Sequence, residues 1–300
     1  MTTTWKSHCL SLICAAALAA CGGTDGVLPD APTGLNVAPG SASGTAVVSF
    51  VAPAMTGSSA ITGYTVTASP GGASATGTSS PITLTGLSPK TAYSYSVVAT
   101  NGQGSSAAAS TNALRFYSVV ETFHEPMTQP NDTIFTGTFT WDATSKAVSN
   151  LAGSLTESMT KVNGSYGPPM TTVVLSHQLS STAATLGSAA GLMVTTFALD
   201  TVNTFDPSGF APGGTQFYGL AAGAKNPMSG GTGNAYAMIF VNTTDPTTAA
   251  AKAQIDMLAY ADCTAGGMMM TSCMTGTTMA GYGKMGTMMG EPASQTITER

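Results

Sequence analysis

The fold of the N-terminal part of the chain is decided by the stretch LSPKTAYSYSVVA, residues 87–99. Within it Tyr93, Tyr95, Val97 and Ala99 alternate with serine and valine residues. Because successive side chains of a β-strand point to opposite faces, these four residues share one face. The stretch therefore predicts a half-buried strand that contributes aromatic and aliphatic side chains to a core.

The sequence around this strand, residues 28–112, has the pattern of an all-β domain. Short β-rich segments are separated by Gly, Pro and Ser clusters at intervals of roughly 8 to 12 residues, which is typical of a sandwich or barrel. Large residues partly alternate with small or hydroxyl residues in Thr45–Phe50 and Ile61–Val66. We therefore expect a β-sandwich.

These motifs resemble the fibronectin type III family, in the form common in exported bacterial proteins. The resemblance lies in the stretch quoted above and in the residues Asn101, Gly104, Pro29, Pro32 and Leu35. It implies an immunoglobulin-like sandwich in which the Tyr93 hydroxyl closes a corner by bonding to upstream backbone. Phe50 stands where the family usually has tryptophan, which implies a smaller core layer. The family serves as spacers, adhesion modules and accessory binding domains, so the resemblance implies no catalytic residue.

Residues 1–20 have the features of a bacterial lipoprotein signal peptide. The apolar run from Cys9 to Ala20 is shorter than the ~20 residues of a spanning helix and fits the core of a signal peptide. It ends in Leu18-Ala19-Ala20-Cys21, which resembles a lipobox. This predicts that Cys21 becomes the lipidated mature N-terminus and that residues 21–27 form a short tether.

The predicted lipid anchor places the chain in the cell envelope. Several acyl chains hold a protein far more firmly than one, since each buried methylene contributes about 0.8 kcal/mol. Gly22 follows the cysteine, and resemblance to Gram-negative lipoproteins then favours export to the outer membrane. The alternative is an ordinary signal peptide cleaved after Ala20, with Cys21 left as an incidental thiol.

Signal removal and acylation of Cys21 leave two cysteines, Cys263 and Cys273. In an oxidising compartment two cysteines favour a disulfide. The competing interpretation is a thiolate metal site. It lacks nearby partners, because His124 and His177 lie far away in the sequence.

Residues 114–300 predict a second, larger and mostly antiparallel β-domain. Its strand-like runs are Arg115–Phe123, Thr133–Trp141, Ala147–Leu155, Thr171–His177, Leu192–Leu199, Gln216–Leu220 and Ala235–Val241. One short helix is expected, with Asp245 as its cap, Pro246 at its first position and Ala249–Ala253 in its body. The fold class is therefore all-β throughout.

The amino-acid composition limits the classes of molecule that the chain can bind. Charged residues make up 8% of the chain, against about 25% in average proteins, and the formal net charge is -5. Binding to nucleic acid needs clustered Lys and Arg, and no such cluster occurs. Solubility must depend on hydroxyl and amide groups.

Residues 114–300 also contain groups that catalysis could use. A Ser-His-acid triad through His124 or His177 stays open, although no Gly-x-Ser-x-Gly elbow occurs. His124 and Glu125 are neighbours on a predicted strand and should face opposite ways. Paired carboxylates for glycoside hydrolysis could come from Glu121, Glu125, Asp142 or Glu157, with nothing to select two of them. A carboxylate at hydrogen-bond distance from His177 in a pocket would favour a hydrolase.

The C-terminal region is rich in methionine, whose thioethers are soft ligands that select Cu(I). The residues are Met268, Met269, Met270, Met274, Met279, Met285, Met288 and Met289. Methionine also fills irregular gaps in hydrophobic cores, so packing is the competing interpretation.

The sequence as a whole favours a non-enzymatic lipoprotein that acts as a binding, adhesion or structural module. Its expected partners are the membrane, through the lipid, and a glycan, surface protein or other envelope component. The alternatives are a secreted hydrolase with an accessory fibronectin type III domain, and a Cu(I) binder.

Overall fold

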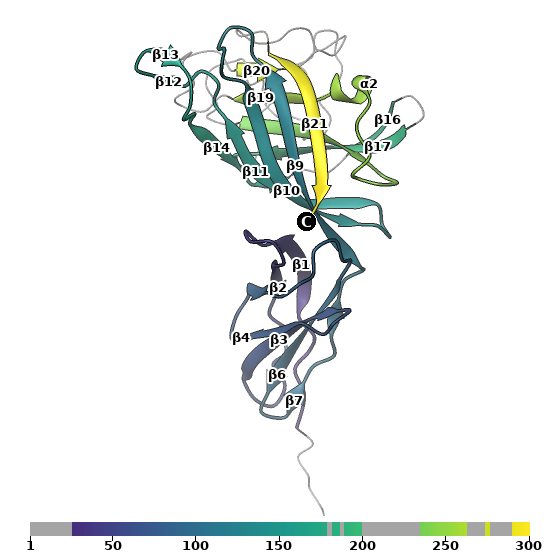
Figure 1. Ribbon diagram of the computed structural model, residues 1–300. Helices are drawn as coiled ribbons and strands as arrows, with labels where there is room; N and C mark the ends of the chain where they lie inside the picture. Colours follow the sequence, from purple (N-terminus) through teal and green to yellow (C-terminus); the bar gives the residue numbers. More distant parts are fainter. Residues whose placement is uncertain (1–25, 179–181, 187–188, 200–234, 263–273, 277–289) are drawn as a thin grey trace, which may run out of the picture.

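The computed structural model describes residues 26–178, 182–186, 189–199, 235–262, 274–276 and 290–300. Its secondary structure is nearly all β, and every strand pairing in these residues is antiparallel. Two separate clusters of buried apolar side chains form the cores of two bodies (Figure 1). The all-β prediction is confirmed.

The first body is a sandwich of two sheets. The three-stranded sheet has the order β1-β2-β5 and the five-stranded sheet the order β4-β3-β6-β7, with β8 also paired to β6. The strands are β1 (Thr33–Pro39), β2 (Ala46–Val51), β3 (Ile61–Ser69), β4 (Ser74–Gly77), β5 (Ile82–Leu84), β6 (Ser94–Asn101), β7 (Gly104–Ser105) and β8 (Ala109–Ser110).

The predicted face of residues 93–99 lies in the core of this sandwich. Tyr95, Val97 and Ala99 are each at most 1% exposed. The Tyr93 hydroxyl accepts a hydrogen bond from the Ser88 N–H at 3.0 Å, which confirms the corner. Phe50 packs its ring against Tyr64 at 4.8 Å between centroids. The corner and the alternation together fix how the two sheets face each other.

The second body is also built from two sheets, of five strands in the order β14-β11-β10-β9-β21 and of six strands in the order β15-β17-β18-β19-β20, with β16 paired to β17. Figure 1 shows the five-stranded sheet in front of the other. The strands are β9 (Leu114–His124), β10 (Thr133–Asp142), β11 (Ala147–Thr156), β12 (Lys161–Val162), β13 (Ser165–Tyr166), β14 (Thr172–Leu175), β15 (His177–Gln178), β16 (Thr182–Leu186), β17 (Ala189–Phe197), β18 (Ala235–Asn242), β19 (Ala259–Asp262), β20 (Met274–Gly276) and β21 (Glu291–Glu299).

Most strand predictions for this body are confirmed to within a few residues. Thr171–His177 is divided into two strands that belong to different sheets, and Gln216–Leu220 lies outside the described residues. The sequence pattern of β9 determines which of its faces packs on the core. Tyr117, Val119 and Phe123 lie at inward positions of the alternating pattern and are buried.

The predicted helix is placed wrongly. The helix α2 spans Lys252–Ile255, and the N–H of Ala251 donates to the side chain of Gln254 at 2.6 Å. Asp245 instead accepts hydrogen bonds from the N–H and hydroxyl of Thr247, at 2.9 and 2.8 Å. An Asp that bonds to backbone two residues on makes a local turn, and this turn competes with helix initiation.

The outward face of the five-stranded sheet explains how a chain so poor in charge presents a polar surface. Thr136, Val120 and Thr296 stand side by side on β10, β9 and β21, and all three are exposed. The next row holds Thr138 and Thr298. Hydroxyl groups therefore make up much of this face, together with the exposed side chains of Val120 and Val174.

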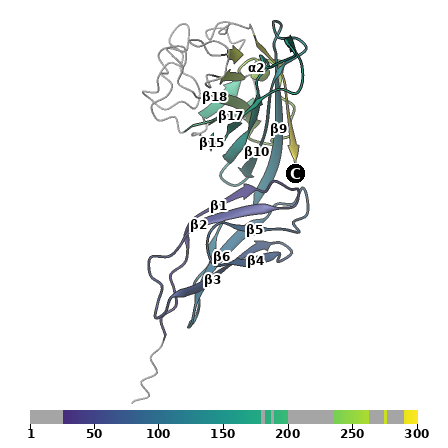
Figure 2. The ribbon, with the colours of Figure 1, turned by 90° about the vertical axis from the view of Figure 1, so that its left-hand side faces the viewer.

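The two bodies follow each other along one line. β9 begins at Leu114, next to the first sandwich, and runs away from it (Figures 1 and 2). The described chain starts at Gly26, at the end of the first sandwich that is farthest from the second body. In the described residues no helix is both long and apolar enough to span a membrane.

Candidate functional site

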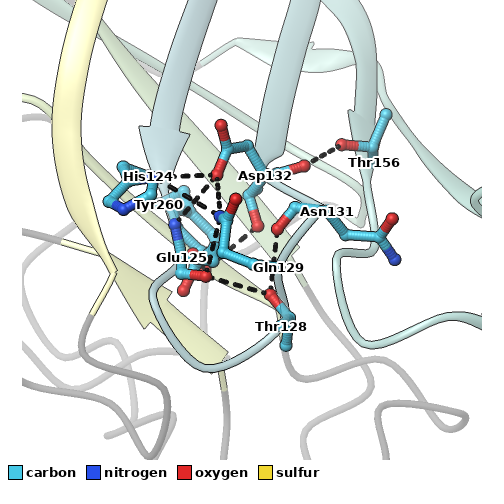
Figure 3. A network of polar contacts seen from close by, with 9 residues as sticks. His124, Glu125, Thr128, Gln129, Asn131, Asp132, Thr156 and Tyr260 are labelled. Carbon is cyan, nitrogen blue, oxygen red and sulfur yellow. Dashed lines mark hydrogen bonds and ion pairs between the residues drawn. The ribbon is translucent and has the colours of Figure 1, made fainter. Parts of the chain in front are cut away.

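A polar network in the second body joins the end of β9 to the start of β10 (Figure 3). Asp132 is its centre. One oxygen, Oδ1, accepts hydrogen bonds from the Glu125 N–H at 3.1 Å and from Gln129 Nε2 at 2.8 Å, and lies 3.1 Å from His124 Nδ1. The Asn131 amide donates to the carbonyls of Ser158 and Thr160 at 2.8 and 3.0 Å. The network holds the loop between β9 and β10 in place. It leaves the His124 side chain about half exposed, at 51%.

On the other side of the same strand end, Glu125 lies in the interior. The hydroxyl of Tyr260 donates to its Oε1, and Thr133 Oγ1 donates to the Tyr260 hydroxyl at 3.2 Å. Tyr260 belongs to β19 of the six-stranded sheet, so this contact joins the two sheets. The Tyr260 ring also packs on Phe123, with 4.7 Å between centroids.

Burial sets the protonation of Glu125. Loss of hydration raises the pKa of its carboxyl to about 7, although the hydrogen bonds with Tyr260 and Thr133 favour the charged form. Its second oxygen, Oε2, is buried and has no hydrogen-bond partner. Glu125 is therefore close to half protonated at neutral pH.

Glu121 is the more extreme case. It lies on β9 between Phe135 and Gln295 in the sheet register, is fully buried, and neither of its oxygens has a hydrogen-bond partner. Burial raises the pKa of this carboxyl well above its usual value. Because an unpaired charge is costly in a core, Glu121 is held as the neutral acid.

These groups do not form the catalytic arrangements considered from the sequence. His124 is exposed and Glu125 is buried, which confirms that they face opposite ways. Glu121 and Glu125 share a face four residues apart, which is roughly 13 Å along a strand. Glycosidase pairs are separated by about 5 to 9.5 Å. The network works as a clamp that holds a loop and joins the two sheets.

The remaining candidates lie apart from each other. His177 Nδ1 is 3.2 Å from Ser176 Oγ, and in the described part of the chain no carboxylate bonds to it. Asp142 accepts a hydrogen bond from Asn112 at 2.8 Å, next to the first sandwich. Glu157 accepts from the Thr171 hydroxyl. The observation that would favour a hydrolase is thus missing from the described residues.

Several predicted site residues lie outside the described residues, so their predictions stay open. They are Cys21, Cys263, Cys273, Met268, Met269, Met270, Met279, Met285, Met288 and Met289. Met274 begins strand β20. Among the residues whose positions are described, no three His, Cys, Asp or Glu side chains are grouped to hold a metal ion.

The sequence did not identify Tyr260 as the partner of Glu125. The two are 135 positions apart, and each is simply one residue in an alternating strand. The signal in the sequence was a glutamate at an inward position of the alternating pattern, namely Glu121 within β9 and Glu125 just after its end.

Comparison with known proteins identifies the first body. Residues 30–113 match the model of the fibronectin type III domain. Among solved structures, the chain is similar to titin kinase and its flanking domains, with 16% identity, a TM-score of 0.26, and coverage of 44% of this chain and 30% of that one. The chain thus spans less than a third of that structure. A search of curated proteins finds no match.

Proposed function

Because residues 30–113 form a fibronectin type III domain, which is a binding or structural module, we propose that this chain is a lipid-anchored stand-off protein of the cell envelope. In this proposal the domain holds the second β-domain away from the membrane in a fixed orientation. The second domain then binds an envelope component without catalysing a reaction.

The observation that carries this proposal is the path of the chain. The described residues begin at the end of the fibronectin type III domain that lies opposite the second body (Figure 2). Hydrogen bonds fasten this start, since the Val27 N–H donates to Ser58 Oγ at 2.7 Å and the Asn101 amide donates to the Val27 carbonyl at 3.0 Å. A tether entering here separates the membrane from the second domain by the length of a sandwich. One nine-residue strand such as β3 corresponds to roughly 30 Å.

Arg300 contacts both domains at their junction. The Arg300 N–H donates to the Phe116 carbonyl at 2.9 Å, and the Lys90 N–H donates to the Arg300 carbonyl at 2.7 Å. The Arg300 guanidinium donates to the carbonyls of Gly40 and Ser41 at 3.0 and 3.4 Å. These contacts between the two domains support the proposal that the second domain is held in a fixed orientation.

Asparagine side chains add a second clamp. Asn36 and Asn150 exchange hydrogen bonds between their amides at 2.9 and 3.0 Å, and the Asn150 amide also donates to the Val37 carbonyl at 2.9 Å. Thr140 Oγ1 donates to the same carbonyl at 2.8 Å. The two domains are therefore joined by side-chain contacts as well as by the covalent linker.

The anchor is tested with Cys21→Ser in a Gram-negative host. We expect the wild-type chain to incorporate radiolabelled palmitate and the variant to lack the label, because serine has no thiol to take the diacylglyceryl group. Cys9→Ser, which lies within the same leader but outside the lipobox, is the matched control and should keep the label. Undiminished labelling of Cys21→Ser would contradict the proposal.

A further inference from the structure

The second domain has a pocket to which the proposed role, holding this domain away from the membrane, assigns no function. It has a volume of about 400 Å³ and lies beside the start of β9 and the ends of β10 and β21. Its lining includes Arg115, Tyr117, Trp141, Asp245, Thr247 and Glu299. A volume in the range of roughly 300 to 1,000 Å³ is usual for small-molecule sites.

Two aromatic side chains of the wall have polar atoms with no partner in the protein. Tyr117 and Trp141 are only 4% and 2% exposed. Within the described residues, neither the Tyr117 hydroxyl nor the Trp141 indole N–H makes a hydrogen bond, and neither is sealed from solvent. Buried tyrosine and tryptophan usually satisfy these groups, so their freedom here points to a ligand.

The rings themselves are held firmly. Tyr117 stacks on Phe139 with 5.3 Å between centroids and 16° between planes. The Lys146 ammonium lies over the Trp141 ring, 5.9 Å from its centroid. The free donors therefore have fixed positions, and a ligand that meets them loses little side-chain freedom of the protein on binding.

The charges around the pocket select the class of ligand. Arg115 forms an ion pair with Glu299, and Asp245 adds a second carboxylate, so the wall carries one positive and two negative groups. Together with the Lys146 ammonium over Trp141, these charges balance, so the surroundings of the pocket favour a neutral ligand. The Thr247 hydroxyl and N–H already donate to Asp245 Oδ1, which positions that carboxylate as an acceptor.

We infer that this pocket binds a neutral saccharide, such as the terminal sugar of an envelope glycan. A sugar hydroxyl both donates and accepts, so a ring with several of them can satisfy the donors Tyr117, Trp141 and Arg115 together with the acceptors Asp245 and Glu299. This inference rests on the proposed role as a binding module and names its ligand class.

The test uses tryptophan fluorescence, because the chain contains only Trp5 and Trp141. In the full chain carrying Trp5→Phe, emission reports on the pocket alone. The probes are glucose, N-acetylglucosamine, maltose and the anionic glucuronate. We expect saturable change with at least one neutral sugar and a weaker response to glucuronate than to glucose. No saturable change with any neutral sugar, or preferential binding of glucuronate, would overturn the inference.

A matched pair of variants locates the binding. Tyr117→Phe removes only the unpartnered hydroxyl and should weaken binding about five- to tenfold, the effect of one hydrogen bond. Tyr95→Phe removes another unpartnered hydroxyl, in the core of the first domain, and should leave affinity unchanged. Equal affinities for both variants and the parent would place binding elsewhere and refute the site. Palmitate labelling of Cys21→Ser does not depend on sugar binding, so the failure of one proposal can be distinguished from the failure of the other.

Discussion

Between about pH 5 and pH 8 the second β-domain is expected to lose roughly 3 kcal/mol of stability through Glu125 alone. Its pKa is about 7 in the folded chain and 4.5 as an ordinary carboxyl. Below pH 4.5 the group is protonated in both states and has no effect. As the pH rises toward 7, the unfolded chain releases the proton while the folded chain keeps it, so the folded state is disfavoured. Once the pH is above the folded-state pKa of about 7, Glu125 is ionised in both states and the stability falls no further.

Glu121 acts in the same direction. Burial also raises the pKa of its carboxyl well above the usual value, so ionisation of Glu121 at rising pH likewise destabilises the folded state. The charge of Asp132 raises the pKa of Glu125 further, and the hydrogen bonds from Tyr260 and Thr133 lower it. The two hydrogen bonds do not offset the loss of hydration.

The variant Glu125→Gln isolates this effect. The amide keeps an oxygen that can accept from Tyr260 but cannot ionise. We expect the variant to gain up to about 3 kcal/mol at pH 8 and to show a shallower dependence on pH in urea unfolding. Glu157→Gln, at a partly exposed carboxylate just after the end of β11, should keep the wild-type dependence. An unaltered pH dependence in Glu125→Gln would contradict the assignment.

The second large effect is expected at the domain junction. Asn150 has a positive φ of 57° at an irregularity of the β10–β11 register, and this turns its amide toward the fibronectin type III domain. Asn150→Gly tolerates that backbone but loses the bonds to Asn36 and Val37. At about 1 kcal/mol for each of three hydrogen bonds, we expect the free energy of unfolding to fall by 2 to 3 kcal/mol.

Asn163 provides the control for this substitution. It also has a positive φ, 52°, but lies exposed in the turn between β12 and β13, away from the junction. Asn163→Gly should change stability by less than about 0.5 kcal/mol. Equal losses for the two variants in urea titration would show that backbone conformation, and not contact between the domains, determines the effect.

The sequence was sufficient where the information is local. Alternation in residues 93–99 gave the buried face of β6, and the Tyr93 corner followed from the family resemblance. The strands β9 and β10 were predicted because their apolar residues repeat every second position. In each case the signal lies within a dozen residues.

Two kinds of feature could not be predicted from the sequence. One is contact between residues far apart in the chain, and the other is the choice between a helix cap and a local turn. Alternation places Glu125 inward but does not reveal that Tyr260, from another sheet, meets it. Arg115 and Glu299 form one wall of a pocket although 184 positions separate them. The helix was placed too early because an Asp before Pro can either cap a helix or close its own turn, and Asp245 does the latter.

The central claim, a stand-off protein held by lipid, is tested most directly by the mass of its N-terminal fragment. Cleavage before Asp25 would release Cys21–Thr24 from the mature chain purified from membranes. We predict that this peptide starts at Cys21 and carries a diacylglyceryl group on sulfur. A fragment with an unmodified thiol, or one that still contains residues of the leader, would contradict the account.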